Sequence, residues 1–403
     1  MAGVADQRSA TRVRGEPSIL LRLWRNKDTR SVILQILTMA LLFAFLAYII
    51  NNAMLNLAVL GKTFSFDFLG FPASYDINQR LIEYTSQSTH FRAMLVGILN
   101  TALVAFFGII TATIVGFLFG IIRLSNNWIA SHIVYCIIEF TRNVPVLLHI
   151  LLIHGIIVHV LPSPRQAHSL ADSIFLSNRG LTIPDPIFGE GFSYTVIAFF
   201  VAVGIIVTFY RWARKARDER GKIYPVFWIS AGILFGLPFL VFLLSGSPLG
   251  WEVPTLGRFN LKGGITMIPE FLALWLALSL YTSAFIAEIV RAGILAISKG
   301  QWEASQAVGL QRNRILQLVI IPQALRVIIP PLTSQYLNLT KNSSLAIAIG
   351  YMDIVATIGG ISMMQTGKEM ESMILVLSIY LCFSLVISAF MNWYNQRIKL
   401  VER

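Results

Sequence analysis

Charged residues are scarce in this chain of 403 residues. Asp, Glu, Lys and Arg make up 13% of it, against about 25% in soluble domains. The two cysteines, Cys136 and Cys382, both lie inside apolar runs, which excludes a disulfide framework. Because 56% of the residues are hydrophobic, the composition predicts an integral membrane protein. In such a protein the net charge of +12 comes from basic residues clustered in short loops, where they set the orientation of the spans. We therefore expect no nucleic-acid partner.

No catalytic or metal-binding motif stands out. Gly61-Lys62-Thr63 resembles the end of a P-loop, but Asn56 stands where the first glycine is needed. The histidines His149, His154 and His159 recur at five-residue intervals, which scatters them around a helix. We therefore expect no ATP-binding site, no metal site and no enzymatic activity in this chain.

Eight apolar stretches are each long enough to cross a bilayer as a helix, which takes about 20 residues. They cover approximately 32–51, 95–122, 134–160, 193–211, 225–245, 268–290, 327–350 and 373–393. The first follows a basic N-terminus, as a signal peptide would, but no A-x-A site comes after it, so we expect an uncleaved span. The sequence predicts an all-α membrane protein with about eight transmembrane helices.

The basic residues are distributed unevenly between the predicted loops. Of 32 Lys and Arg, 22 fall in segments on the side of the N-terminus and eight on the other side. The positive-inside rule then places both termini, and the loop between the sixth and seventh spans, in the cytoplasm.

Prolines predict two irregular spans. A helix from Trp128 to Val160 would be about 50 Å long, against a hydrocarbon core of about 30 Å. We expect its first part to lie obliquely at the inner surface and the part from Pro145 onward to cross. Pro330 and Pro331 predict an irregular start of the seventh span.

The loop at 298–322 carries the strongest functional signal. Glu303, Ala304, Ala307 and Gly309 form a small polar stretch, and Pro322 follows at a fixed distance. Small residues allow another backbone to approach, and Gly309 suits a left-handed helix end. We expect a short docking helix with Trp302, Val308 and Leu310 as its apolar anchors. The alternative is a simple linker between two spans.

This loop resembles the EAA loop of ABC-importer permeases, whose pattern runs E-A-A, three residues, G, nine residues, I-x-L-P. Ala287-Glu288…Arg291…Gly293-Ile294, Glu139…Arg142…Pro145 and Leu339…Lys341…Ser344-Leu345 are similar to further motifs of the polar amino-acid uptake branch. The resemblance implies a five-span type I importer core at 95–160 and 265–395. To this core are added an extra first span with its loop (32–94), an inserted two-span hairpin (161–264) and tails at 1–31 and 396–403. This architecture resembles the Q-type permease subunit of broad-specificity L-amino-acid importers.

The resemblance also implies partners and a location. A permease of this kind lies in the bacterial inner membrane among lipids and pairs with a second, homologous permease. It receives L-amino acids from a periplasmic binding protein. A separate cytoplasmic ATPase binds ATP and Mg²⁺ and docks on the EAA loop, so no cofactor is expected in this chain.

Two further groups of polar residues lie in or beside the predicted spans. Glu139 with Arg142 and Glu288 with Arg291 are each three residues apart, which favours interfacial ion pairs. Lys341 lies inside the seventh span, where a charge is costly and therefore a functional candidate. It is accompanied by Gln335, Asn338, Asn342 and Ser344, and together these side chains form a candidate substrate pathway. The alternatives for Lys341 are an ion pair or a position facing a water-filled vestibule.

Two other functions are open to a protein of this composition. An ion-gradient-driven secondary amino-acid transporter would need paired carboxylates near the midplane and inverted repeats. A membrane-embedded enzyme would need a catalytic constellation at one depth. The mid-span segments show neither feature, so we favour the ATP-driven importer.

Overall fold

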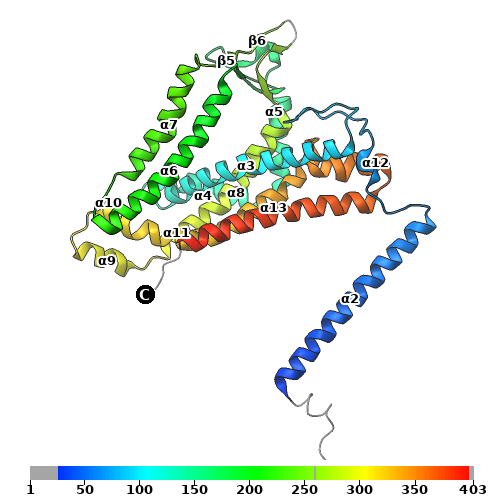
Figure 1. Cartoon of the computed structure of the whole chain (residues 1–403), viewed down its shortest axis with the longest axis horizontal. Coiled ribbons are helices and arrows are strands. Elements are labelled where there is room, and N and C mark those ends of the chain that lie inside the picture. The colour runs from blue at the N-terminus through cyan, green and yellow to red at the C-terminus, as the bar shows by residue number, and fades with distance from the viewer. Residues whose placement is uncertain (1–25, 258–259, 399–403) are drawn as a thin grey trace, which may run out of the picture. The chain divides into compact units, whose positions relative to one another are not determined.

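The computed structural model of the chain describes residues 26–257 and 260–398. Among these, seven helices are long and apolar enough to span a membrane, and a bent pair forms an eighth candidate (Figure 1). The mostly helical, multi-span fold predicted from the sequence is thereby confirmed. Most of the predicted N-terminal tail and the end of the C-terminal tail lie outside the described residues. The chain divides into two compact units, Met1–Asp67 and Phe68–Arg403.

The first unit contains one long helix, α2 (Lys27–Val59). It begins at Asn26, whose side chain accepts a hydrogen bond from the Asp28 backbone N–H at 3.0 Å and so satisfies one free helix-end donor. None of its side chains is buried, although most of them are apolar. At 33 residues it is longer than the predicted span 32–51, because helical geometry continues on both sides of the apolar run.

In the second unit, α8 (Pro269–Leu295) is the most deeply buried of the candidate spans. It packs against α3 (His90–Arg123), α5 (Val146–His159) and α11 (Ile321–Asn342), which surround it in Figure 1. Its buried residues are largely Ala, Ser, Thr and Leu, so neighbouring helices approach it closely. The helix is the axis around which the second unit is built.

Small residues form the interface between α3 and α8. Gly116 and Gly120 of α3 face Ile286 and Val290 of α8, and an added Cβ at either glycine would lie within 3.0 Å of them. This G-x-x-x-G pair is typical of close helix packing in membranes. Without side chains at these two positions, the backbones of the two helices come together.

The third predicted span is broken, as expected. α4 (Trp128–Asn143) and α5 meet at an angle of 109°, with Pro145 at the break. Proline has no N–H to continue the helical ladder of α4, so the chain turns there. Nδ1 of His149 lies 3.2 Å from the Pro145 carbonyl oxygen and can satisfy it. The two-part segment predicted from length and proline position is therefore present.

The prediction for the seventh span is wrong in its detail. Pro330 and Pro331 lie inside the continuous helix α11, and the irregularity is a π-helical turn, η3 (Leu316–Ile320), which precedes it. Before this turn come α9 (Lys299–Ala307) and α10 (Arg312–Ile315). Membrane helices tolerate proline because neighbouring groups and small local adjustments satisfy the freed carbonyls. The span consequently begins earlier than the predicted residue 327.

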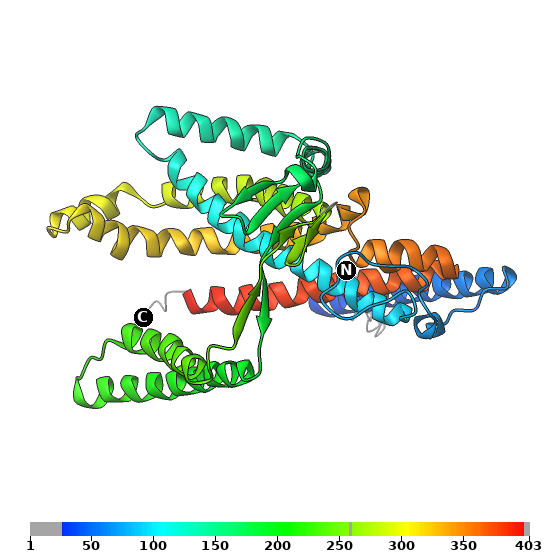
Figure 2. The ribbon, with the colours of Figure 1, turned by 90° about the horizontal axis from the view of Figure 1, so that it is seen from above.

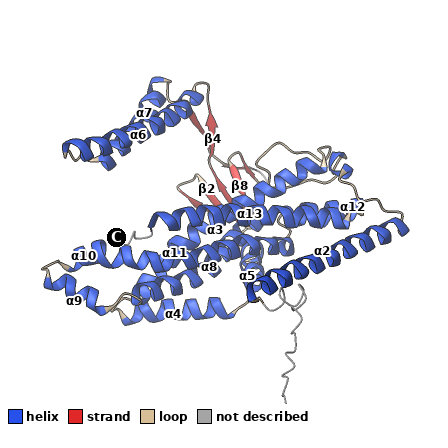
Figure 3. Ribbon diagram, turned by 60° about the horizontal axis from the view of Figure 1, so that its bottom comes forward, coloured by secondary structure: helices blue, strands red, loops and turns tan. Residues whose placement is uncertain are grey.

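The chain after α11 turns back through a series of short helical segments. These are the 3₁₀-helix η4 (Ser343–Ile349), the π-helix η5 (Val355–Ser362) and α12 (Met363–Thr366). The final helix, α13 (Glu369–Ile398), then runs back along α11 (Figure 3). Glycines with positive φ, Gly350 and Gly367, end η4 and α12 and allow these reversals.

The inserted segment contains short strands as well as the predicted hairpin. After a 3₁₀ turn η2 (Pro164–Gln166), the strands β1 (His168–Leu170), β2 (Ile174–Ser177), β3 (Gly180–Ile183) and β8 (Ile265–Met267) form an antiparallel sheet. Thr182 pairs with Thr266 in its register. The strand β4 (Asp185–Phe188) pairs with β5 (Leu249–Glu252), and β6 (Thr255–Leu256) pairs with β7 (Leu261–Lys262). These strands are too short for sequence periodicity to reveal them.

The helical hairpin of the insertion consists of α6 (Phe192–Arg220) and α7 (Val226–Leu244), which lie side by side (Figures 1 and 2). Alanines such as Ala202 and Ala213 are its buried residues, and α7 has none. Both predicted spans are therefore present, and many of their large apolar side chains are exposed.

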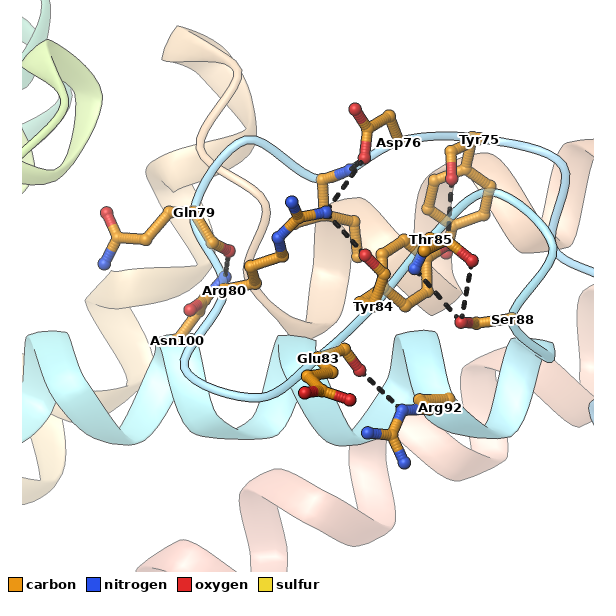
Figure 4. Close-up of polar contacts among 11 residues, drawn as sticks. Tyr75, Asp76, Gln79, Arg80, Glu83, Tyr84, Thr85, Ser88, Arg92 and Asn100 are labelled. Atoms are coloured by element: carbon orange, nitrogen blue, oxygen red, sulfur yellow. Dashed lines mark hydrogen bonds and ion pairs between the residues drawn. The ribbon is translucent and has the colours of Figure 1, made fainter. Parts of the chain in front are cut away.

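A loop ahead of α3 packs against this helix within the second unit. It contains the 3₁₀ turn η1 (Asp67–Gly70), and Ala73, Ile77 and Tyr84 are buried against α3. Figure 4 shows its polar contacts: the side chain of Asn100 donates to the Gln79 carbonyl at 2.9 Å, and Tyr84 donates to the Tyr75 carbonyl at 2.9 Å. These bonds hold the loop across the first turns of α3.

The α3–α8 interface provides a test of this architecture. Gly116→Ala places a Cβ 2.6 Å from Ile286, so the two helices must separate or repack, at a cost of about 1–3 kcal/mol. We expect a lower thermal unfolding midpoint for the purified protein. Gly155→Ala in α5, where a Cβ meets nothing within 4 Å, is the matched control and should leave the midpoint unchanged. Equal midpoints for the two variants would contradict close packing at Gly116.

Candidate functional site

The loop at 298–322 contains the short helix expected from its sequence, α9 (Lys299–Ala307). α9 ends in two reversed hydrogen bonds, from Gly309 N–H to the Gln306 carbonyl at 2.8 Å and from Leu310 N–H to the Ser305 carbonyl at 3.2 Å. Gly309 has φ of +81°, which is left-handed. This combination is the Schellman motif, and it fixes the direction in which the chain leaves the helix.

The small residues of α9 lie on its surface. Glu303, Ala304 and Ala307 are exposed, whereas Ser305 is buried and donates to the Gln301 carbonyl. Of the expected apolar anchors of the docking helix, Trp302 and Leu310 are half-buried and Val308 is 80% exposed. Gly309 sets the chain direction, so Val308 points away from the loop interior. An exposed face of Glu and Ala is therefore available to a partner.

The loop is connected to α11 by a short, ordered path. Ile315 and Ile320 are fully buried at the ends of the π turn, and Pro322 lies in the first turn of α11. The side chain of Gln323 donates to that of Gln301 at 3.2 Å, which ties α11 directly to α9. A displacement of α9 would therefore reach α11 through packed residues.

The four charged residues singled out from the sequence lie close together near this end of the bundle. Arg142 Nη1 is 3.7 Å from Glu139 Oε1, and Arg291 Nη2 is 3.2 Å from Glu288 Oε2. Glu288 also pairs with Arg123 at the end of α3, which the sequence analysis counted only as an inner basic residue. A carboxylate between two arginines links α3 and α8, so one ion pair predicted within a helix is part of a contact between two helices.

Four of the candidate pathway residues lie in the second half of α11, and Ser344 lies in η4, directly after it. Asn338 and Lys341 are exposed, whereas Gln335, Asn342 and Ser344 are half-buried. Within the described ranges, no carboxylate lies within 4 Å of the Lys341 ammonium group. An ammonium group exposed to hydrocarbon would be costly, so this face requires a protein partner or water beside it.

A second polar cluster, which we call the outer cluster, consists of Asn100, Tyr351, Asp353 and Tyr380. It lies at the opposite end of α11. Asp353 is fully buried; its carboxylate accepts hydrogen bonds from the Ala356 N–H at 2.8 Å and from the Tyr380 hydroxyl at 3.2 Å.

The rest of the outer cluster ties the α11–α13 segment to α3. Tyr351 donates to the Asn100 carbonyl at 3.2 Å, and the Asn100 side chain donates to the Met352 carbonyl at 2.9 Å. Burial raises the pKa of Asp353 to about 7, while the hydrogen bonds from Ala356 and Tyr380 partly oppose this effect. Asp353 lies between the candidate spans rather than within one.

No group of three or more His, Cys, Asp or Glu side chains gathers in metal-binding geometry within 26–257 and 260–398. The polar groups of both clusters instead bond to one another across helices.

Comparison with known proteins places this arrangement in a family. Residues 221–400 match the model of the binding-protein-dependent transport system inner membrane component. The chain is 48% identical to the general L-amino acid transport system permease protein AapQ of Rhizobium johnstonii, over 93% of both chains. The chain belongs to the family of amino-acid ABC-transporter permeases.

Two further relatives support the assignment. The putative amino-acid ABC transporter permease protein YhdX of Escherichia coli is 46% identical over 94% of this chain and 96% of its own. The glutamate/glutamine/aspartate/asparagine transport system permease protein BztB of Rhodobacter capsulatus is 44% identical over 93% and 95%. Since these alignments include the first span and the insertion, both additions are common to the relatives.

Three residues that the sequence analysis did not single out prove central to the two clusters. Arg123 stands at the end of a span, where a basic residue is ordinary. Asp353 is the one carboxylate in the apolar stretch from Leu345 to Ile361. This isolation is the feature of the sequence that could have identified it. Asn100 follows Ile98 and Leu99 in a largely apolar stretch of α3.

The outer cluster gives a pH prediction. In an unfolded chain Asp353 has a pKa near 3.8, so between about pH 4 and 7 the folded protein binds more protons and its stability falls as pH rises. Asp353→Asn keeps an acceptor but cannot ionise. We expect it to flatten the dependence of the unfolding temperature on pH.

The measurement is the thermal unfolding midpoint at about pH 5 and about pH 8. The unmodified protein should unfold at a lower temperature at the higher pH, and Asp353→Asn should show a smaller difference. Asp172→Asn, at an exposed turn, is the control and should keep the original dependence. A dependence that Asp353→Asn leaves intact would show that Asp353 is not the responsible group.

Proposed function

We propose that this permease takes up L-amino acids from the periplasm and that ATP hydrolysis on a separate cytoplasmic ATPase drives it through the loop at 298–322. A periplasmic binding protein delivers the amino acid, and a second, homologous permease completes the pathway. Both termini lie in the cytoplasm. The observation that carries the proposal is the exposed face of Glu303, Ala304 and Ala307 on α9, held by the Schellman end at Gly309.

The physical argument for coupling begins with the small size of the alanine side chains on α9. Alanine side chains allow another backbone to approach, so α9 fits a cleft on a partner without requiring that partner to deform. Its connection to α11 through Gln301, Gln323 and the buried Ile315 and Ile320 transmits a rigid displacement. α11 carries the candidate pathway residues, so a movement of the ATPase reaches the solute.

The pathway itself is proposed along the exposed side of α11. Lys341 offers a positive charge to the carboxylate of an amino acid, and the amides of Asn338 and Asn342 offer hydrogen bonds in place of water. The face is exposed in a single chain because the second permease would cover it. ATP and Mg²⁺ belong to the ATPase, and no residue of this chain is assigned to them.

Coupling predicts a specific effect at Gly309. Gly309→Val forces a β-branched residue into a left-handed backbone, at a cost of about 1–2 kcal/mol, although a Cβ there meets nothing within 4 Å. We expect the membrane protein to accumulate normally, while ATPase association and uptake fall several-fold. Both are measured on the reconstituted complex.

The matched control is Gly300→Ala in the same helix, where a Cβ has its nearest neighbour at 4.0 Å. It should leave ATPase association and uptake unchanged. Normal uptake in Gly309→Val would reduce the loop to a linker, and loss of the membrane protein itself would assign Gly309 to folding.

The pathway predicts a separation between assembly and transport at Lys341. Lys341→Met keeps the approximate length of the side chain and removes its charge. The complex should therefore assemble with its ATPase and respond to the binding protein. It should transport an amino acid at least tenfold more slowly. A single charged hydrogen bond is worth about 1.5–3 kcal/mol, which corresponds to this factor.

Lys341→Arg retains the positive charge and should recover part of the rate. Unchanged uptake by Lys341→Met would remove Lys341 from the pathway. Failure to assemble would identify it as a structural ion-pair residue at the interface with the second permease.

A further inference from the structure

The basic residues at one end of the α6–α7 hairpin are arranged in a way that setting the membrane topology does not require. Residues 211–222 contain six basic and two acidic residues, a net charge of +4. A topology signal depends only on how many charges a loop has, not on their arrangement. Here the basic side chains line hollows at the surface of α6 together with aromatic residues.

Of the four arginines in this segment, Arg211, Arg214 and Arg220 have no counter-ion within 4 Å among the described residues. Lys215 pairs with Glu219 at 3.7 Å, and Arg217 lies 3.6 Å from Asp218. Neither Arg211 nor Arg214 has a carboxylate within 4 Å in the part of the chain that the structure describes. Both are exposed and stand on one face of α6, three residues apart. Among the residues that the structure describes, no carboxylate within 4 Å neutralises the positive charge of this face.

The surroundings of these arginines change from apolar to basic along the helix. A hollow of about 350 Å³ is lined by Ile206, Val207 and Tyr210 and, further along, by Arg211 and Arg214. Tyr210 and Arg214 also line an adjoining hollow of about 80 Å³, together with Arg217 and Tyr224. The smaller hollow is well below the roughly 300 Å³ that drug-sized ligands occupy, so it suits a single small polar group.

An apolar groove that ends at two unpaired arginines and two tyrosines matches the chemistry of a lipid. We propose that Tyr210, Arg211 and Arg214 bind the phosphate of an anionic phospholipid, with one of its acyl chains lying along Ile206 and Val207. Arginine and tyrosine donate to phosphate oxygens, and arginine does so with two parallel N–H groups. A soluble phosphate or nucleotide would make no use of the apolar half of the groove.

The position of the hairpin in the fold supports this occupant. α6 and α7 pack chiefly on each other, and their outer surfaces are exposed apolar side chains such as Phe200, Phe235 and Leu240. Such surfaces lie against lipid in a membrane. Basic pockets at the ends of membrane helices bind anionic headgroups, so a bound lipid would fix the depth and orientation of a hairpin that has few protein contacts. This inference does not depend on which solute the permease transports.

The test is a titration of the full-length permease, purified in a neutral detergent, with dioleoyl-phosphatidylglycerol and, separately, with dioleoyl-phosphatidylcholine. Bound lipid is counted by native mass spectrometry. We expect phosphatidylglycerol to bind preferentially. Arg211→Gln/Arg214→Gln should weaken its binding by roughly tenfold or more, because each basic residue near an anionic surface contributes appreciably. Tyr210→Phe, which removes one hydroxyl, should weaken it by a smaller factor.

The matched control is Lys215→Gln/Arg220→Gln, which removes the same charge from residues that line a different hollow with Trp212. It should change binding less than about threefold. Equal losses in the two double variants would mean attraction by net charge alone and would overturn the site.

Two other results would also overturn it. Displacement of the lipid by excess inorganic phosphate would assign the arginines to a soluble anion. Unchanged lipid binding in Arg211→Gln/Arg214→Gln, combined with loss of the ATPase from the complex, would assign this surface to a protein partner.

Discussion

The close approach of α3 and α8 is the contact on which the second unit depends. In a membrane, lipid is as apolar as leucine, so helices associate through close packing and internal hydrogen bonds rather than through exclusion of water. Gly116 and Gly120 allow the backbones to meet, and the Thr111 and Ser279 hydroxyls bond across the same interface at 2.5 Å. With this pair fixed, α5 and α11 have a defined surface on which to pack.

Polar groups then stabilise the two ends of this packed pair. At one end Glu288 lies between arginines of α3 and α8, close to the helix that leads into α9. At the other, Asn100 and Tyr351 join α3 to the reversing segment after α11. A buried polar group without a partner is costly, so each of these contacts requires its helices to keep one register. The bundle is thus held at both ends and can transmit movement along α11.

The insertion and the core follow different physical rules. Core helices bury small residues against α8, while α6 and α7 remain exposed and meet the rest of the unit mainly through short strands. A hairpin of this kind depends on the bilayer for much of its stability, since its apolar surface has no protein to cover it. The basic side chains at its end are therefore as much a part of its structure as its apolar faces.

The amino-acid sequence by itself determined the membrane class, the apolar segments, the break at Pro145 and the short helix that ends at Gly309, because hydrophobic runs, proline and glycine act locally. It could not reveal the short strands, whose pairing is between distant segments, or the π turn that takes the place of an irregularity at Pro330 and Pro331. Only the tertiary structure decided that Arg123 joins Glu288, that Asp353 is buried and that Lys341 is exposed. Burial and pairing depend on which helices meet, and distant contacts leave no mark in a local pattern.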